Sequence, residues 1–234
     1  MADANADTKR ILSFDIGTRN LAACLLTVPK GAAAAVRSEF NVELWALIDL
    51  DCGQSVTRAV YNMVNIFTTD FPEFLTADAI VIESQQIAKN IMQSVASAIQ
   101  SHFLTLRFCG RMSPDLTVDV MGGDGKLRVY DGPVYWKPAR GPQYQRNKRT
   151  GIEHCRAILT QRREVTDSPV GYAHFEEILT FFESAPKLDD LADGLLQGLA
   201  HALGNKNQVK RAEKRGMVEC VRTPSAKRLL IEIE

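Results

Sequence analysis

The chain has 234 residues, of which 45% are hydrophobic and 24% charged, and its formal net charge is zero. This composition fits one globular domain with an ordinary core, or one domain with an appendage. No apolar run approaches the roughly 18 residues of a membrane span, so we expect no membrane partner.

The neutral total hides an uneven distribution of charge. Ten Lys/Arg and four Asp/Glu lie in residues 122–165, and eight and four lie in residues 204–234, while the rest is acidic. Basic segments on an otherwise acidic chain suit a polyanion held over metal ions, although solvated basic loops have the same composition. Five dispersed cysteines without a CxxC pair, and no secretion signal at the start, predict an intracellular protein in a reducing compartment.

The first part of the chain predicts an antiparallel meander. Residues 11–16 form an apolar strand that ends in Asp15 and a turn, and residues 20–28 form a second strand. Every second residue from Val42 to Leu50 is apolar, as on one face of a third strand, with Trp45 and Leu47 on the other face. The apolar spacing in residues 54–69 indicates a helix that packs on this sheet.

The later elements predict parallel strands and helices. Residues 79–83 are a short apolar run that ends in Glu83, which is typical of a buried parallel strand. We expect helices at 84–108, 148–163, 170–182 and 187–203, and a strand at 116–121. The Gly/Pro-rich basic segment 122–147 is expected to be an irregular insertion. The predicted organisation is a single nuclease domain at 1–204 and a basic C-terminal tail at 205–234.

Four carboxylates lie on apolar elements. Asp15 and Glu83 end two strands, and Asp190 and Asp193 lie three residues apart on one leucine-rich helix, with Asp189 as an alternative to Asp190. A buried acid needs a partner or a metal, and hard carboxylate oxygens are ligands for divalent cations. Each acid alone has an ordinary role as a helix cap or surface charge. Together they predict two Mg²⁺ ions and metal-assisted phosphodiester hydrolysis.

Three motifs, FDIGTRNLA, IVIESQQIAKN and KLDDLADGLL, resemble the acidic motifs of RuvC-type Holliday junction resolvases. The DIGxxNxA form is most similar to the poxvirus and fungal mitochondrial branch. The resemblance implies a ribonuclease H-like α/β fold: a mixed central five-stranded sheet, three antiparallel then parallel strands, flanked by helices. It also implies an enzyme that resolves four-way DNA junctions by paired symmetric nicks, with Asp15, Glu83, Asp190 and Asp193 as catalytic and metal-binding residues.

The same resemblance implies two Mg²⁺ ions per active site, with Mn²⁺ as a substitute, and branched DNA as the partner. Symmetric nicking needs two active sites, so a homodimer is expected. The helix at 87–108 is a candidate dimer face, although packing on the sheet would use the same residues. A poxvirus-like member would act in the cytoplasm, at the site of viral replication.

Several residues near the acids are candidates for DNA contact. The candidate DNA-binding residues are Arg19, Gln86, Lys89, Lys148, Arg149 and Arg156. Arg162 and Arg163 would extend a stripe of phosphate contacts along the same helix. Tyr135 and Trp136 could stack on an unpaired base, although loop packing would use them equally well.

Three other functions are compatible with parts of the sequence. A ribonuclease H-like nuclease acting on RNA–DNA hybrid or other branched DNA would use the same acids. FDIGT also resembles the first phosphate loop of actin-like and sugar-kinase ATPases, but residues 122–125 are a poor second phosphate loop and the DxxD pair has no role there. A junction-binding protein with an inactive site would not need four acids.

Overall fold

The computed structural model describes residues 8–31, 39–85, 90–134 and 141–204. The strands are β1 (Thr8–Asp15), β2 (Leu21–Pro29), β3 (Asn41–Ile48), β4 (Ala79–Glu83) and β5 (Thr117–Met121). The α-helices are α2 (Val56–Thr69), α3 (Asn90–Phe108), α4 (Gln143–Glu164), α5 (Pro169–Ser184) and α6 (Leu188–Ala202). Two 3₁₀ helices, η1 (Pro72–Thr76) and η2 (Gly123–Arg128), complete the described elements. Within these ranges, no helix combines the length and the apolar character needed to cross a membrane.

The sheet has the order β3-β2-β1-β4-β5, with β1 at its centre. Pairing is antiparallel between β1 and β2 and between β2 and β3, and parallel between β1 and β4 and between β4 and β5. The predicted fold class, a mixed five-stranded sheet flanked by helices, is confirmed. In the parallel pair, Phe14 lies opposite Ile82. The next residues, Asp15 and Glu83, are the last of their strands and therefore lie side by side at the edge of the sheet.

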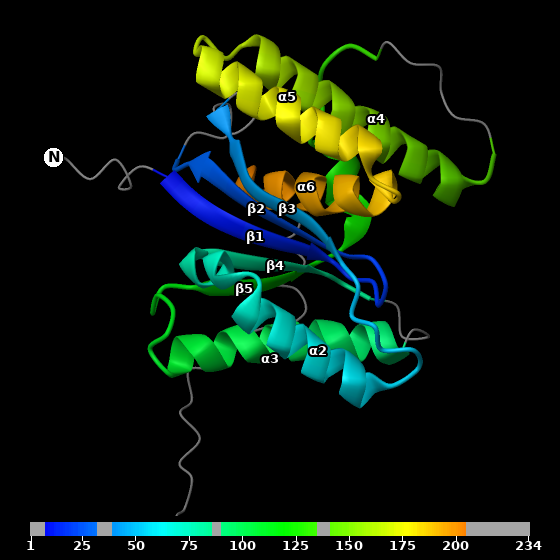
Figure 1. Cartoon of the computed structure of the whole chain (residues 1–234). Coiled ribbons are helices and arrows are strands. Elements are labelled where there is room, and N and C mark those ends of the chain that lie inside the picture. Colours follow the sequence, from blue (N-terminus) through cyan, green and yellow to red (C-terminus); the bar gives the residue numbers. More distant parts are fainter. Residues whose placement is uncertain (1–7, 32–38, 86–89, 135–140, 205–234) are drawn as a thin grey trace, which may run out of the picture. The chain divides into compact units, whose positions relative to one another are not determined.

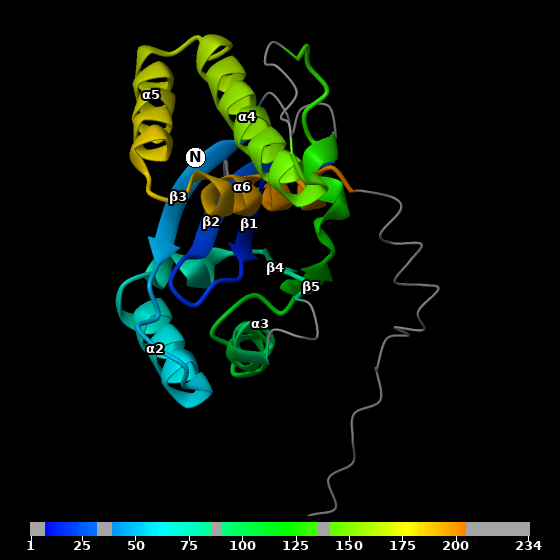
Figure 2. The same ribbon diagram turned by 90° about the vertical axis from the view of Figure 1, so that its right-hand side faces the viewer.

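Helices cover both faces of the sheet. Figures 1 and 2 show α2 and α3 on one face and α6 on the other, with α4 and α5 beyond α6. Each face of the sheet packs on its own hydrophobic core, and successive residues of β1 point into one or the other. Ile11 packs on the α6 side, and Leu12 and Phe14 pack on the α2–α3 side. The Phe14 ring lies 5.3 Å from that of Phe67. β1 is therefore fixed from both faces.

Helix α6 lies close to the sheet because glycines face β2. A Cβ at Gly198 would come 2.6 Å from Leu26 Cδ1, and one at Gly194 would come 3.7 Å from Ala22 Cβ. Larger side chains at these positions would push the helix outward. The close approach brings the acidic positions of α6 down to the ends of the strands.

The segment 122–147 differs from the prediction of an irregular insertion. Residues 123–128 form η2, which packs through buried Val129 and Lys126, and α4 begins at Gln143 rather than at Lys148. The prediction was wrong for these parts because apolar spacing marks only packed helical turns, and the first turn of α4 is exposed. The predicted helix at 84–108 is observed over Asn90–Phe108, and residues 86–89 lie outside the described residues.

Candidate metal centre

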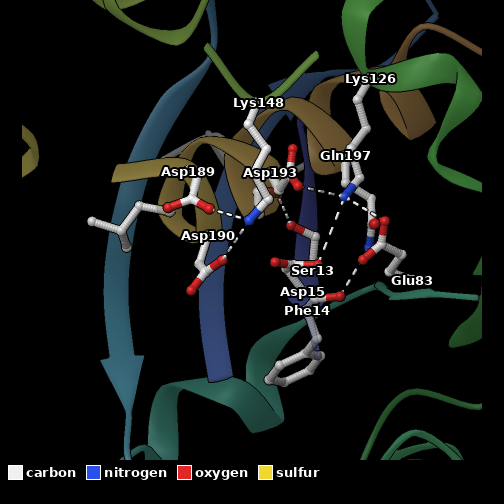
Figure 3. Close-up of polar contacts among 12 residues, drawn as sticks. Ser13, Phe14, Asp15, Glu83, Lys126, Lys148, Asp189, Asp190, Asp193 and Gln197 are labelled. Carbon is white, nitrogen blue, oxygen red and sulfur yellow. Dashed lines mark hydrogen bonds and ion pairs between the residues drawn. The ribbon is translucent and has the colours of Figure 1, made fainter. Parts of the chain in front are cut away.

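Three carboxylates from distant parts of the chain meet at one edge of the sheet. Asp15 ends β1, Glu83 ends β4 and Asp193 lies in α6 (Figure 3). One ligand atom from each residue lies within 4.8 Å of the others, so the three could hold a metal ion. Oxygens on opposite sides of a Mg²⁺ ion lie about 4.2 Å apart. Neighbouring oxygens lie about 3 Å apart, so the three side chains would have to move closer together to bind one ion.

The fourth predicted acid lies outside this cluster. Asp190 is in the first turn of α6, where one of its oxygens lies 4.0 Å from Lys148 Nζ. Its neighbour Asp189 accepts a hydrogen bond from the same ammonium group. Lys148 thus balances one of the two negative charges of the Asp189–Asp190 pair, and the assignment of either acid as a ligand remains a prediction.

Lys126 is a member of the site that the sequence did not reveal. Its Nζ lies 2.8 Å from Glu83 Oε1, 3.4 Å from Asp193 Oδ2 and 3.8 Å from Asp15 Oδ1. Its side chain is only 5% exposed. The sequence around it, GDGKLRV, has the composition of a solvated turn, and no spacing marks this lysine as buried. Only the packing of η2 on α6 reveals its position.

The carboxyl groups of the cluster differ in the direction in which their pKa is shifted. Burial raises the pKa of Asp15 well above its usual range, and a hydrogen bond with Glu83 raises it further. Burial would also raise the pKa of Glu83, but the hydrogen bond with Asp15 and the charge of Lys126 lower it overall. Asp15 therefore keeps its proton to higher pH than Glu83 does. A bound divalent ion would favour the ionised form of each ligand.

Hydrogen bonds fix α6 against the strands that carry the other two acids. Gln197 Nε2 donates to Phe14 O at 3.1 Å and to Val81 O at 3.2 Å, and the donor is fully buried. The first carbonyl directly precedes Asp15, and the second lies two residues before Glu83. Ser13 Oγ donates to Gly194 O, next to Asp193. Gln197 thus joins all three elements that supply the carboxylates.

The predicted phosphate contacts on α4 are mostly paired with acids or carbonyls. Arg156 forms ion pairs with Glu183 at 2.6 Å and with Glu153 at 2.7 Å. Arg163 Nη1 lies 2.5 Å from Glu176 Oε2, and Arg162 Nε donates to a backbone carbonyl, Phe40 O.

The remaining candidates for DNA contact fall into two groups. Arg19, in the turn after β1, and Arg149, on α4, are exposed. Neither of them forms an ion pair with another residue of the described ranges. Gln86, Lys89, Tyr135 and Trp136 lie outside those ranges.

Comparison with known proteins gives weak likenesses only. No protein-family model matches the chain. No curated protein sequence matches it either. The structure is similar to that of Thermus thermophilus RuvC, with a TM-score of 0.49 and 14% identity over 85% of this chain and 96% of that one.

Two further structures have lower scores. T. thermophilus RuvC in complex with a Holliday junction substrate has a TM-score of 0.48 and 13% identity, over 85% of this chain and 96% of that one. A member of the Ppx/GppA family from Aquifex aeolicus has a TM-score of 0.30 and 10% identity, over 87% of this chain and 99% of that one. All three TM-scores lie below 0.5, so these likenesses carry no inference about activity.

Proposed function

We propose that this protein is a Mg²⁺-dependent, structure-selective endonuclease that resolves four-way DNA junctions by paired symmetric nicks. The observation that carries the proposal is the convergence of Asp15, Glu83 and Asp193 from β1, β4 and α6, with ligand atoms within 4.8 Å of one another. Three oxygen ligands in a partly buried site suit a hard divalent cation. The order and spacing of the three acidic motifs support the choice of substrate.

The chain's own residues have distinct roles in this proposal. Asp15 is the most buried acid and contacts Glu83, so it is the proposed bridging ligand between two cations. Glu83 and Asp193 would be the other ligands of the first cation. Asp190 would be a ligand of the second cation after it separates from Lys148. When bound, the divalent ions would activate water and stabilise the leaving 3′ oxygen. Mn²⁺ favours the same oxygen ligands and should substitute.

The DNA would lie across the edge of the sheet that carries the acids. We propose that exposed Arg19 and Arg149 contact its phosphates, with Gln86 and Lys89 as further contacts after Glu83. Phosphate contacts from such side chains set position and not sequence preference. Lys148 would join them only if it releases Asp189, and Arg156 only if it releases Glu183.

Paired nicks require two active sites, so a homodimer is part of the proposal. Along α3, Val95, Ile99 and Phe103 are buried against the sheet, whereas Leu104 and Phe108 are exposed. The exposed end of α3 is the proposed dimer face. We further propose a nuclease domain at 1–204, a basic tail at 205–234, membership of the poxvirus and fungal mitochondrial branch, and a reducing intracellular location.

The test is cleavage of a synthetic four-way junction, compared with linear duplex and RNA–DNA hybrid, with and without Mg²⁺. We expect Mg²⁺-dependent paired nicks in the junction only. Asp15→Asn should lower the rate by about three orders of magnitude or more, since it removes a ligand charge from the site. Asp70→Asn, an exposed residue at the end of α2, is the matched control.

The outcomes separate the alternatives. Cleavage of hybrid in preference to junction would identify a ribonuclease H-like enzyme with the same metal site. ATP hydrolysis without nuclease activity would favour the ATPase alternative. Junction cleavage that survives Asp15→Asn would refute the proposed site.

A further inference from the structure

The ammonium group of Lys126 lies where a metal held by the three acids would lie. Its distances of 2.8, 3.4 and 3.8 Å to oxygens of Glu83, Asp193 and Asp15 place it among all three side chains. An ammonium has three donors and no acceptor. It can therefore neutralise the acids of the cluster, but it cannot join them as a metal ligand.

The backbone around Lys126 is built to hold the side chain in this position. η2 packs on α6, and buried Val129 anchors the end of this short helix. A Cβ at Gly123 would lie 3.2 Å from Glu83 Oε1, so the glycine lets the chain pass close to this acid. Figure 3 shows Lys126 extending from η2 toward Glu83 and Asp193.

The oxygens nearest to Lys126 are also the oxygens that a metal would use. Glu83 Oε1 accepts a hydrogen bond from Lys126, and Asp193 Oδ2 lies 3.4 Å away from the same nitrogen. A divalent ion bound to these oxygens at about 2.1 Å would lie beside the ammonium group. The two cations would repel strongly at such a separation, so they exclude one another.

We propose that Lys126 is an internal cation that competes with the divalent metal for Asp15, Glu83 and Asp193, so that metal binding requires the ammonium group to leave. This inference rests on the proposed metal site. Lys126 balances one negative charge of the three acids in the metal-free protein and lowers the affinity of the site for metal. It is a regulatory group of the site and is not itself a ligand.

The first test is Mn²⁺ binding measured by isothermal titration calorimetry at one pH, with the full chain. Lys126→Met removes the ammonium and keeps an unbranched apolar stem. We expect the Kd for Mn²⁺ to fall by about tenfold or more, equivalent to about 1.4 kcal/mol. Lys187→Gln is the matched control, because it removes one positive charge from the exposed start of α6 without touching the three acids. Its Kd should change by about threefold at most.

Two results of this titration would overturn the inference. Equal affinities in the wild type and Lys126→Met would exclude competition while leaving the metal site intact. No binding in either protein would refute the metal site itself, and with it the competition. Junction cleavage by the wild type, measured in parallel, tests the proposed function independently of the competition.

A second measurement uses the wild type alone and does not depend on the folding of the variant. Acylation of lysines is followed by mass spectrometry with and without saturating Mn²⁺. Lys126 is buried in its ion pairs, so we expect slow labelling without metal and labelling about fivefold faster or more with metal, while exposed Lys187 keeps its rate. Unchanged or slower labelling of Lys126 with Mn²⁺ would show that the ammonium stays in place.

Discussion

Gln197→Met tests whether one buried amide holds the candidate metal centre together. The change keeps the length of the side chain but removes the donor shared by Phe14 O and Val81 O, at 3.1 and 3.2 Å. Each buried carbonyl that loses this donor costs about 1.5–2.5 kcal/mol, a value that already includes the lost hydrogen bond.

One effect acts in the opposite direction. Gln197 Oε1 is buried without a hydrogen-bond partner among the residues that the structure describes. Removing this unpaired acceptor raises the free energy of unfolding by about 1 kcal/mol. The expected net loss is therefore about 2–4 kcal/mol in the free energy of unfolding, or about 4–16 °C in Tm for a chain of this size.

The assay is urea unfolding followed by fluorescence, combined with Mn²⁺ titration. Since Gln197 joins α6 to β1 and β4, its loss should weaken Mn²⁺ binding as well as the fold. Gln161→Met, on the exposed side of α4, is the control and should change neither quantity. A Tm shift below about 2 °C in Gln197→Met would refute the assigned role. A full shift with unchanged Mn²⁺ affinity would confine that role to stability.

Three further predictions follow from the packing and charges. In EDTA, the stability of the wild type relative to Asp15→Asn should fall as pH rises above about 4, because burial raises the pKa of Asp15 and the folded state holds this proton longer than the unfolded state. Thermal unfolding from pH 4 to pH 8 measures this, and a rise would contradict the assignment of the proton. Gly198→Val should lower the free energy of unfolding in urea by about 1–3 kcal/mol, because its Cβ would lie 2.6 Å from Leu26 Cδ1. An unchanged urea midpoint would show that α6 can shift freely. Arg156→Ala should lower the free energy of unfolding by less than about 1 kcal/mol, since its ion pair with Glu183 is screened by solvent. The Kd for the four-way junction should change by about twofold at most. A large loss of affinity at low salt would instead support the predicted phosphate contact.

The convergence of the three acids at the candidate metal centre could be predicted because local sequence carries its signal. Asp15 and Glu83 each end an apolar run, and the parallel pairing of β1 and β4 then places them side by side. Asp193 was predictable because an acid among leucines on a buried helix needs a partner. These three residues satisfy the same rule, in which a charged group on an apolar element indicates a site.

The remaining features depend on contacts that sequence spacing does not encode. Lys126 follows a run of glycines, and its burial results from the packing of η2 on α6. Lys148 and Arg156 were predicted as phosphate contacts because they are basic and helical. Their observed partners, Asp189 and Glu183, belong to later helices. Charge pairing between elements that are distant in sequence follows only from the tertiary fold.

The distribution of the three acids has a consequence for biosynthesis. Asp15 and Glu83 leave the ribosome early, but Asp193 belongs to α6, the last helix that the structure describes. An N-terminal fragment that stops before α6 would carry two of these acids in place of three. A nascent or truncated chain therefore cannot bind metal as the complete domain would. The proposed nuclease activity would therefore require that α6 has been synthesised and has packed against β1 and β2.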